Sequence, residues 1–385
     1  MQKKKLILIG AMHFALDAYM GFFAIYLVIA RLDPFKAALI STATFFIGNM
    51  LQPFMGYTAD RLRGKVPLFM GLILASVFNS LIGITINYTL LFLFMFLGIV
   101  GSSFFHPAGA NVAGAAFERK KDTSVAIFTT LGTIGFALSQ PIFSLFAGRY
   151  GTQASVLLCI PAVIIAGSYL VFSKVEIHGQ EEKVKLKELK TILVQRFVPI
   201  IMLFLIMVFR STFIFSMNLF LAKTLEQWGF QRHLYAMANT VFMLSGAIGI
   251  LCVGYLASFI RPSKLLFLSQ VGFLPFFLIF VYYGRAGNVL YTFIFLALTG
   301  FIINSGHAAN IVMGHRITPE LTSTISGVLI GFAWGVSSFG PTLCALLQSS
   351  ISILPGMASG LVILSLFPIT AAVLTLFLTR EVDGQ

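Results

Sequence analysis

The sequence predicts an all-α membrane protein with twelve spanning helices arranged as two six-helix repeats. Of its 385 residues, 58% are hydrophobic and only 10% are charged, and the mean hydropathy is +0.94. A soluble globular chain carries about 25% charged residues, so this composition suits lipid rather than water. Two further observations support the class: apolar runs long enough to cross a bilayer, and motifs that recur in both halves.

The apolar runs set the number of helices. A hydrocarbon core of about 30 Å requires about 20 apolar residues per helix. Dividing the chain at charged and turn-forming residues predicts helices near 6–30, 35–57, 66–87, 89–115, 124–148, 153–173, 197–222, 233–258, 264–283, 288–313, 323–348 and 356–379. The first run follows three lysines, as in a signal peptide. It is too long for one and has no small-residue cleavage site, so we expect a retained helix.

One long polar stretch divides the chain. It predicts an N-terminal six-helix bundle at 1–173, a linker at 174–196 and a C-terminal six-helix bundle at 197–385. The linker forms either a short amphipathic helix on the membrane surface or a solvated connection. The three cysteines lie in apolar runs without CxxC spacing, which predicts buried thiols and no disulfide framework or metal knuckle.

Basic residues give the orientation. Nineteen of the 26 lysines and arginines fall on the side of the N-terminus and the linker, six fall on the opposite side, and Arg210 lies within a span. The positive-inside rule therefore predicts that both termini and the linker are cytoplasmic. The net charge of +13 does not indicate a nucleic-acid partner, because the basic residues form short clusters between apolar runs.

The two halves repeat. "GYTADRLRGK" at 56–65 returns as "GYLASFIRPSK" at 254–264. Gly135 and Pro141 in the fifth span recur as Gly335 and Pro341 in the eleventh span. His106 in the fourth span has a counterpart in the tenth. Three matches in the same order predict two parallel copies of one six-helix unit, an arrangement typical of a large class of membrane transporters with a site between the repeats.

These motifs carry a resemblance to a known family. "GYTADRLRGK", placed in the loop between the second and third spans, resembles the signature of the major facilitator superfamily, although Arg63 and Gly64 invert the usual order. Its matching residues are Gly56, Asp60, Arg61 and Lys65, which we expect to form a conformational latch between helix ends.

"GTIGFALSQP" at 132–141, with Gly132, Gly135 and Pro141, is similar to the fifth-helix motif that the superfamily's antiporters carry. "QPFMGYTADR", "SSFFHPAGANVAG" and "ITPELTSTISGVLIGFAWGVSSFGP" resemble the fosmidomycin resistance protein branch. The resemblance implies twelve helices around a central cavity, alternating access and proton-coupled export of small molecules.

Asp17 is the only one of 13 acidic residues that falls inside a predicted span. It lies eleven residues after Leu6, about 17 Å along the helix axis and so near mid-membrane. An ionised carboxylate there costs at least about 2.5 kcal/mol, so burial favours a group that takes up and releases a proton. The alternative is a structural aspartate bonded to a neighbouring helix.

His13 lies one helical turn before Asp17, on the same face. It shares the proton of Asp17, hydrogen-bonds the carboxylate, or is a cavity histidine without a protonic role. A His/Asp pair can also bind a metal, but two ligands are too few and the sequence indicates no third nearby. We therefore expect no metal site and no cofactor.

Arg210 is the only basic residue within a span, at a depth comparable to that of Asp17 in the first helix of the second half. Its planar guanidinium suits a carboxylate or phosphonate. It binds an anionic substrate, pairs with Asp17 in one conformation, or forms a static ion pair. The other polar side chains expected at a substrate site are Gln52, His106, Asn111, Asn218, Asn304, His307 and Asn310. His106 ranks first because Pro107 opens the helix beside it.

No enzymatic motif is present: the chain has no GxSxG, Walker or HExxH sequence. The sequence predicts a proton-coupled antiporter of a bacterial inner membrane that exports a small anionic drug-like or metabolite molecule. Protons, the substrate and the lipid bilayer are the expected partners, and a monomer is expected. The alternatives are an importer of an organic anion or metal ion on the same fold, and a transport-dead receptor or scaffold.

Overall fold

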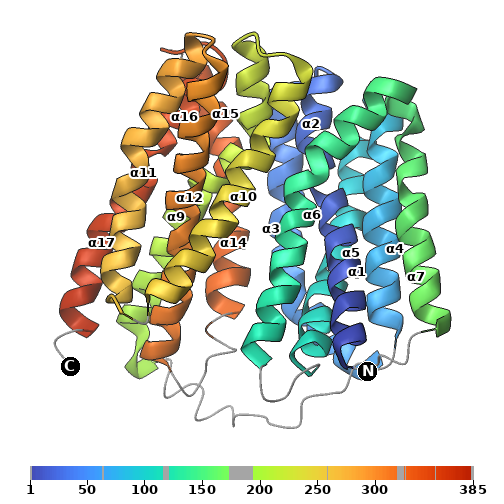
Figure 1. Cartoon of the computed structure of the whole chain (residues 1–385), viewed down its shortest axis with the longest axis horizontal. Helices are drawn as coiled ribbons and strands as arrows, with labels where there is room; N and C mark the ends of the chain where they lie inside the picture. The colour runs from blue at the N-terminus through green and yellow to red at the C-terminus, as the bar shows by residue number, and fades with distance from the viewer. Residues whose placement is uncertain are drawn as a thin grey trace. The chain divides into compact units, whose positions relative to one another are not determined.

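The computed structural model describes residues 2–62, 65–115, 121–172, 194–257, 259–318, 325, 327–351 and 353–382. Within these ranges, the side chains of residues 2–5, 53, 56–62, 111, 114–115, 121–126, 172, 327, 330 and 379–382 are not described. All regular structure in the described part is helical. The chain divides into two compact units, Met1–Glu181 and Glu182–Gln385 (Figure 1).

The N-terminal unit is built around its first helix. Its elements are α1 (Gln2–Met20), α2 (Phe22–Ile29), α3 (Pro34–Leu62), α4 (Val66–Leu81), the 3-10 helix η1 (Ile82–Ile84), α5 (Tyr88–Ala115), α6 (Lys121–Tyr150), the 3-10 helix η3 (Thr152–Leu158) and α7 (Cys159–Phe172). Helix α1 packs against α4, α5 and α6, while α3 packs against α5. The middle of α1 is therefore enclosed by helices that follow it in the chain.

The C-terminal unit repeats this plan. Its elements are α9 (Phe197–Gln227), α10 (Arg232–Leu256), α11 (Pro262–Arg285), α12 (Val289–Ile317), the π-helix η5 (Gly327–Phe332), α14 (Ala333–Ser337), α15 (Gly340–Ser350), α16 (Ala358–Leu364) and α17 (Leu366–Val382). Helix α9 packs against α10, α12, α14, α15 and α17. As in the first unit, the first helix is surrounded by the others.

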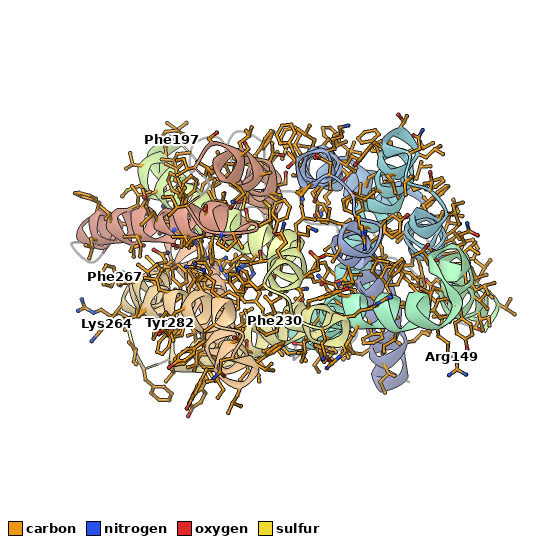
Figure 2. All side chains as sticks on the ribbon, turned by 90° about the horizontal axis from the view of Figure 1, so that it is seen from above. Arg149, Phe197, Phe230, Lys264, Phe267 and Tyr282 are labelled. Carbon is orange, nitrogen blue, oxygen red and sulfur yellow. The ribbon has the colours of Figure 1, made fainter. Side chains whose placement is uncertain are left out.

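Ten helical segments of the described part are long and apolar enough to cross a membrane. They correspond to all the predicted spans except the second, which is α3, and the eleventh, which comprises η5, α14 and α15. Large apolar side chains cover the outer surface, and Leu145 is 73% exposed. Tyr282 is 69% exposed, and Figure 2 shows Arg149 pointing outward from the helices. An apolar surface of this extent is expected to face lipid.

Three predicted spans are divided into shorter helices. The first span bends at Gly21, where a Cβ atom would lie 2.8 Å from Cβ of Ser139 on α6. The eleventh breaks between Ser337 and Gly340, and the twelfth breaks at Ser365. Both breaks lie shortly before a proline, Pro341 or Pro368, which lacks the N–H that would continue the helix.

Several helices extend beyond the predicted ends, and α3 and α9 extend furthest. Helix α3 continues to Leu62, so the expectation that "GYTADRLRGK" lies wholly in a loop is wrong for its first seven residues. Helix α9 continues to Gln227 and includes Glu226, whose carboxylate contacts Nζ of Lys223 at 2.9 Å. Asp17 is nevertheless the only carboxylate in the middle of a described spanning helix.

The predicted linker lies largely outside the described residues, since 173–193 are not described, while α9 begins at the predicted Phe197. The three cysteines are free. Cys344 is buried, but Cys252 is exposed on α10, so the expectation that all three thiols are buried is wrong there.

Candidate functional site

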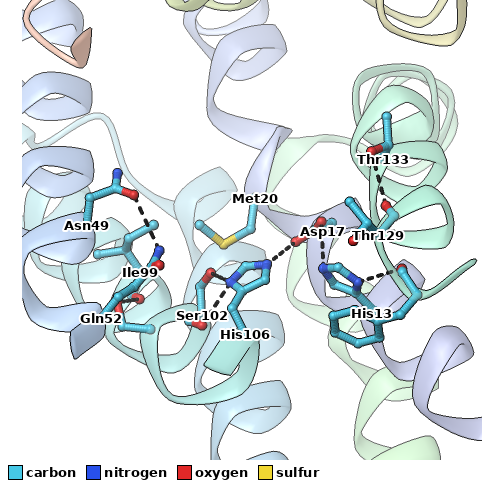
Figure 3. A network of polar contacts seen from close by, with 12 residues as sticks. His13, Asp17, Met20, Asn49, Gln52, Ile99, Ser102, His106, Thr129 and Thr133 are labelled. Carbon is cyan, nitrogen blue, oxygen red and sulfur yellow. Dashed lines mark hydrogen bonds and ion pairs between the residues drawn. The ribbon is translucent and has the colours of Figure 1, made fainter. Parts of the chain in front are cut away.

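Asp17 contacts two histidines at the centre of the N-terminal unit. Its Oδ2 lies 3.2 Å from Nε2 of His13, one turn earlier on α1, and its Oδ1 lies 3.3 Å from Nε2 of His106 on α5. Figure 3 shows the carboxylate between the two imidazole rings. Exposure rises from 5% for the His13 side chain to 17% for Asp17 and 30% for His106. The three side chains therefore form one polar cluster in an apolar unit.

Helix α6 fixes the ring of His13. Nδ1 lies 2.8 Å from the carbonyl oxygen of Phe128, and the two rings stack with centroids 3.9 Å apart. Gly132 lies against the cluster, because a Cβ atom there would fall 2.6 Å from Oδ2 of Asp17. Gly135 lies similarly close to the backbone of Phe14. The glycines of "GTIGFALSQP" thus allow α6 to approach α1 closely.

His106 is held by its own helix. Its Nδ1 lies 3.0 Å from the carbonyl oxygen and 2.9 Å from Oγ of Ser102, one turn earlier on α5. Pro107 follows within the helix. The contacts on Nδ1 leave Nε2 to face Asp17. The prediction placed His106 at a substrate site, whereas the structure places it against the carboxylate.

The expectation that no third potential metal ligand lies near His13 and Asp17 is wrong. One donor atom from each of His13, Asp17 and His106 lies within 4.8 Å of the other two. His106 is 89 positions after Asp17 in the sequence. Only the packing of α5 on α1 brings the two together, so spacing along the chain could not reveal the contact.

Arg210 is the corresponding buried charge of the C-terminal unit, and it is 2% exposed. Its guanidinium donates to the carbonyl oxygen of Ile303 at 3.4 Å and to the thioether of Met207 at 2.9 Å. Nε has no hydrogen-bond partner, and no described carboxylate lies within ion-pair distance. An ion this deeply buried without an anion is costly, which favours a function over a structural role.

His307 on α12 contacts Arg210, with Nδ1 of the imidazole 3.3 Å from Nη2. A guanidinium can only donate, so Nδ1 accepts and Nε2 of the ring carries the hydrogen. The two units are alike here, because in each a charged residue on the first predicted span contacts a histidine on the fourth predicted span. The counterpart of Asp17 with His106 is Arg210 with His307.

The remaining polar residues of the predicted substrate set are more dispersed. Gln52 donates to Oδ1 of Asn49 on its own helix at 3.3 Å. Asn304 donates to the carbonyl oxygen of Gly300 and packs against Gly246 of α10. Asn310 donates to the carbonyl oxygen of Leu203 at 3.4 Å, while its Oδ1 is unpartnered among the described residues. Asn218 is half-buried two turns beyond Arg210. The side chain of Asn111 lies outside the described part.

The predicted latch is described only at Lys65. Its Nζ donates to the carbonyl oxygen of Leu170 in the last turn of α7 at 2.9 Å, an interaction that satisfies a free carbonyl at a helix end. Gly56, Asp60 and Arg61 lie in α3, and their side chains are outside the described part.

The predicted packing motif of the second half is buried. Gly335 lies in α14, and Pro341 lies in the first turn of α15. Pro141, the counterpart of Pro341 in the first half, lies inside the continuous helix α6. A helix break therefore precedes the proline in the second half but not in the first.

Two compact units of apolar helices, each with a charged residue on its first helix in contact with a histidine, are typical of a polytopic membrane protein of the transporter class. Comparison with known families specifies the class. The family model of the Major Facilitator Superfamily matches residues 6–226, more than half of the chain. The chain belongs to the Major Facilitator Superfamily.

Two curated relatives match at low identity. The fosmidomycin resistance protein of Escherichia coli (strain K12) is 23% identical over 323 residues, which cover 81% of this chain and 77% of the relative. The uncharacterized MFS-type transporter YfnC of Bacillus subtilis (strain 168) is 23% identical over 368 residues, which cover 91% and 88%.

Solved structures share the fold. A bacterial homolog of the human lysosomal transporter Spinster, in an inward-facing and unoccupied conformation, matches with a TM-score of 0.82 and 13% identity, covering 100% of this chain and 98% of that one. A mutant of the nucleoside transporter NupG matches with a TM-score of 0.74 and 12% identity, covering 100% and 99%. The chain therefore has the twelve-helix fold of this superfamily, and it is a secondary transporter rather than an enzyme.

Proposed function

We propose that the protein is a proton-coupled antiporter that exports a small anionic drug-like or metabolite molecule by alternating access. The observation that carries the proposal is the cluster of Asp17 with His13 and His106. It places three groups able to bind protons inside the bundle that spans the membrane. An antiporter needs a group that changes protonation between its states, and these side chains supply it.

Asp17 is the proposed proton carrier. It is mostly buried, lies in the middle of a spanning segment, and contacts two imidazoles that stabilise its ionised form when they are protonated. The three groups lie close enough for a proton on one to act on the other two. His13 tunes or shares the proton. His106 belongs to this proton-binding cluster and is not a separate substrate residue.

Arg210 is the proposed anion-binding residue. Its unpartnered Nε and the lack of a described carboxylate leave capacity for an anionic group. His307 contacts Nη2 and is the proposed accompanying residue, because the hydrogen on its Nε2 can be donated. Asn310 lies in the same unit, and its unpartnered Oδ1 can only accept, so it suits a donor group elsewhere on the substrate. A planar fork binds a carboxylate or phosphonate through two parallel hydrogen bonds, which a single ammonium cannot reproduce.

Export is supported by one relative. The fosmidomycin resistance protein is named for resistance to a small molecule, and a secondary transporter can confer resistance by removing that molecule from the cell. The basic-residue bias supports an orientation with both termini in the cytoplasm. The proposed location is a bacterial inner membrane, and the proposed state is a monomer.

Import of an organic anion or of a metal ion is the alternative. His106 supplies a third potential metal-ligating atom beside His13 and Asp17, so the structure supports a cation substrate more than the sequence alone did. The two contacts nevertheless use different carboxylate oxygens at hydrogen-bond distances, which suits protons. A receptor or scaffold has no need of two buried ionisable residues.

Proton movement in proteoliposomes tests the proposal. Purified protein is reconstituted with a pH-sensitive dye inside the vesicles, and candidate compounds are added without an imposed gradient. Fosmidomycin and small organic anions are added first, with an organic cation of similar size as the control. We expect an anion-dependent pH change that protein-free vesicles lack. Transport of an identified anion without any proton movement would contradict the coupling.

A further inference from the structure

We propose that Asp17, His13 and His106 form a site for two protons, and that His106 holds the proton that is exchanged. This inference rests on the proposed function and refines it: Asp17 stays ionised at the centre of the carrier, and the two histidines beside it hold the protons. Its basis is the hydrogen bonding of the two imidazole rings on the sides that face away from Asp17.

Both rings carry a hydrogen on Nδ1. Nδ1 of His13 faces the carbonyl oxygen of Phe128, and Nδ1 of His106 faces both the carbonyl oxygen of Ser102 at 3.0 Å and the hydroxyl of Ser102 at 2.9 Å. A carbonyl oxygen can only accept, and a hydroxyl can accept as well, so a hydrogen on Nδ1 satisfies every contact and each Nδ1 donates. In a neutral imidazole the other nitrogen is then an acceptor, which leaves both Nε2 atoms with a lone pair.

Both Nε2 atoms lie at ion-pair distance from the oxygens of Asp17, although the contact of His13 lacks the alignment of a hydrogen bond. The contact of His13 is made to Oδ2 and that of His106 to Oδ1, at 3.2 and 3.3 Å. An acceptor next to a carboxylate oxygen repels it unless a proton lies between them. Each of the two contacts therefore requires its own proton, and imidazole, the stronger base, carries it on Nε2. The cluster as the structure has it is the form with two protons.

The two protons differ in how firmly they are held. The His13 side chain is 5% exposed and its ring stacks on that of Phe128, whereas the His106 side chain is 30% exposed. Loss of the proton from His13 would leave a buried repulsion that the ring cannot avoid. Loss of the proton from His106 removes the bond between α5 and Asp17 and frees a ring that can move. His106 is therefore the exchanging position.

Among the described residues, no other charged side chain lies in the middle of the helices that pack on α1. The helices packed on α1 are α2, α4, α5, α6 and α7. Besides His106, their ionisable residues are Tyr26, Tyr88, Lys121, Asp122, Arg149, Tyr150, Cys159 and Tyr169. Lys121, Asp122, Arg149 and Tyr150 lie at the ends of α6, and α4 has none. On α1 itself, Tyr19 donates to the carbonyl oxygen of Leu158, and the lysines lie in the first turn.

The test reads the protonation of each histidine directly and needs no substrate. Full-length protein with ¹⁵N-labelled histidine is placed in lipid nanodiscs, and the ring nitrogens are followed by NMR from about pH 5 to pH 9. Single His→Gln variants assign the signals. His307 is an internal control, because Arg210 donates to its Nδ1 and its hydrogen should lie on Nε2.

We expect Nδ1 of His13 and His106 to stay protonated throughout, with both Nε2 atoms protonated at the acidic end. Nε2 of His106 should lose its proton first as the pH rises. Asp17→Asn removes the carboxylate that favours the protonated rings, so both Nε2 atoms should lose their protons at a lower pH than in the wild type. The signals of His307 should stay unchanged. A neutral ring with its hydrogen on Nε2 at position 13 or 106 would overturn the proposal. So would loss of the Nε2 proton of His13 at a lower pH than that of His106.

A divalent cation is the competing occupant. The same spectra are recorded after chelator treatment and after addition of one equivalent of Zn²⁺. Unchanged Nε2 signals support a proton site. Stoichiometric displacement of both Nε2 protons near pH 7 would instead identify a metal site and overturn the proposal. Neither result depends on transport, so failure here is distinguishable from failure of proton-coupled export in vesicles.

Discussion

At Arg210 the guanidinium is 2% exposed, yet its described partners are a carbonyl oxygen, a thioether and an imidazole. Asp17 has the opposite environment, with a basic ring beside each oxygen. Asp17 therefore has basic partners, whereas Arg210 has no described acidic partner. Protons on the two histidines can balance the charge of Asp17, whereas Arg210 remains a cation and lacks an anionic partner among the described residues of its unit. This difference supports separate roles, in coupling and in substrate binding.

Replacing Arg210 by lysine tests the anion-binding role. Arg210→Lys keeps the charge but loses the bidentate fork, so affinity for a transported anion should fall roughly ten- to hundred-fold, equivalent to about 1.5–3 kcal/mol. Affinity is measured on purified protein by calorimetry with an anion identified in the vesicle assay. Arg285→Lys, at the exposed end of α11, is the matched control and should bind normally. Unchanged affinity in Arg210→Lys would contradict anion capture by the guanidinium.

The sequence located both buried charges but not their partners. Counting charged residues within apolar runs identifies Asp17 and Arg210, and helical spacing places His13 beside Asp17. The contact of His106 with Asp17 depends on the rotation of α5 about its axis relative to α1. Apolar residues surround both helices apart from a few polar positions, so the hydrophobic pattern does not fix that rotation. The same reason kept the contact of His307 with Arg210 from being predicted.

At the scale of elements, helix approach sets the geometry of the cluster. Gly132 and Gly135 allow α6 to contact α1 without a side chain between them, and the carbonyl oxygen of Phe128 can then accept from His13. The breaks in the predicted first, eleventh and twelfth spans show where sequence patterns are insufficient. Hydropathy detects a continuous apolar run, whereas helix continuity depends on the missing N–H of Pro341 and Pro368 and on the close contact at Gly21.

Adding one methyl group at Gly132 should disturb the cluster. In Gly132→Ala the new Cβ would fall 2.6 Å from Oδ2 of Asp17, so α6 must shift away from α1. Overpacking of this kind costs about 1–3 kcal/mol. We expect a lower melting temperature in detergent and impaired coupled transport. Gly167→Ala on α7, where a Cβ meets no atom within 4 Å, is the matched control and should leave both unchanged. Equal melting temperatures for the two variants would contradict the packing argument.

At the scale of the whole molecule, two units with the same helix plan agree with the duplicated motifs of the sequence. The number of spans and the repeat were predictable because both depend on hydropathy and on motif order. Orientation rests on charge alone, with nineteen basic residues on one side against six.

Cysteine labelling tests this orientation. A single cysteine is introduced at Lys185 in the predicted linker, in a variant lacking the three native cysteines, and intact cells are treated with a membrane-impermeant maleimide. The positive-inside rule predicts no labelling of this site until the cells are lysed. A cysteine at Gly287, between α11 and α12, is the control for the opposite side and should react in intact cells. Labelling of the linker in intact cells would contradict the orientation.

The most direct test of proton-coupled transport is uphill movement of an identified anion in vesicles with an imposed pH gradient. Asp17→Asn is close in shape to the wild type but cannot be protonated, so it should fold and bind the anion yet fail to accumulate it. Passive exchange can continue, since exchange needs no net proton step. His13→Asn should damage transport less and mainly shift its pH dependence. Asp33→Asn, outside the spans, is the matched control and should behave as the wild type. Full gradient-driven accumulation by Asp17→Asn would contradict the account, because no other carboxylate lies in the middle of a described spanning helix.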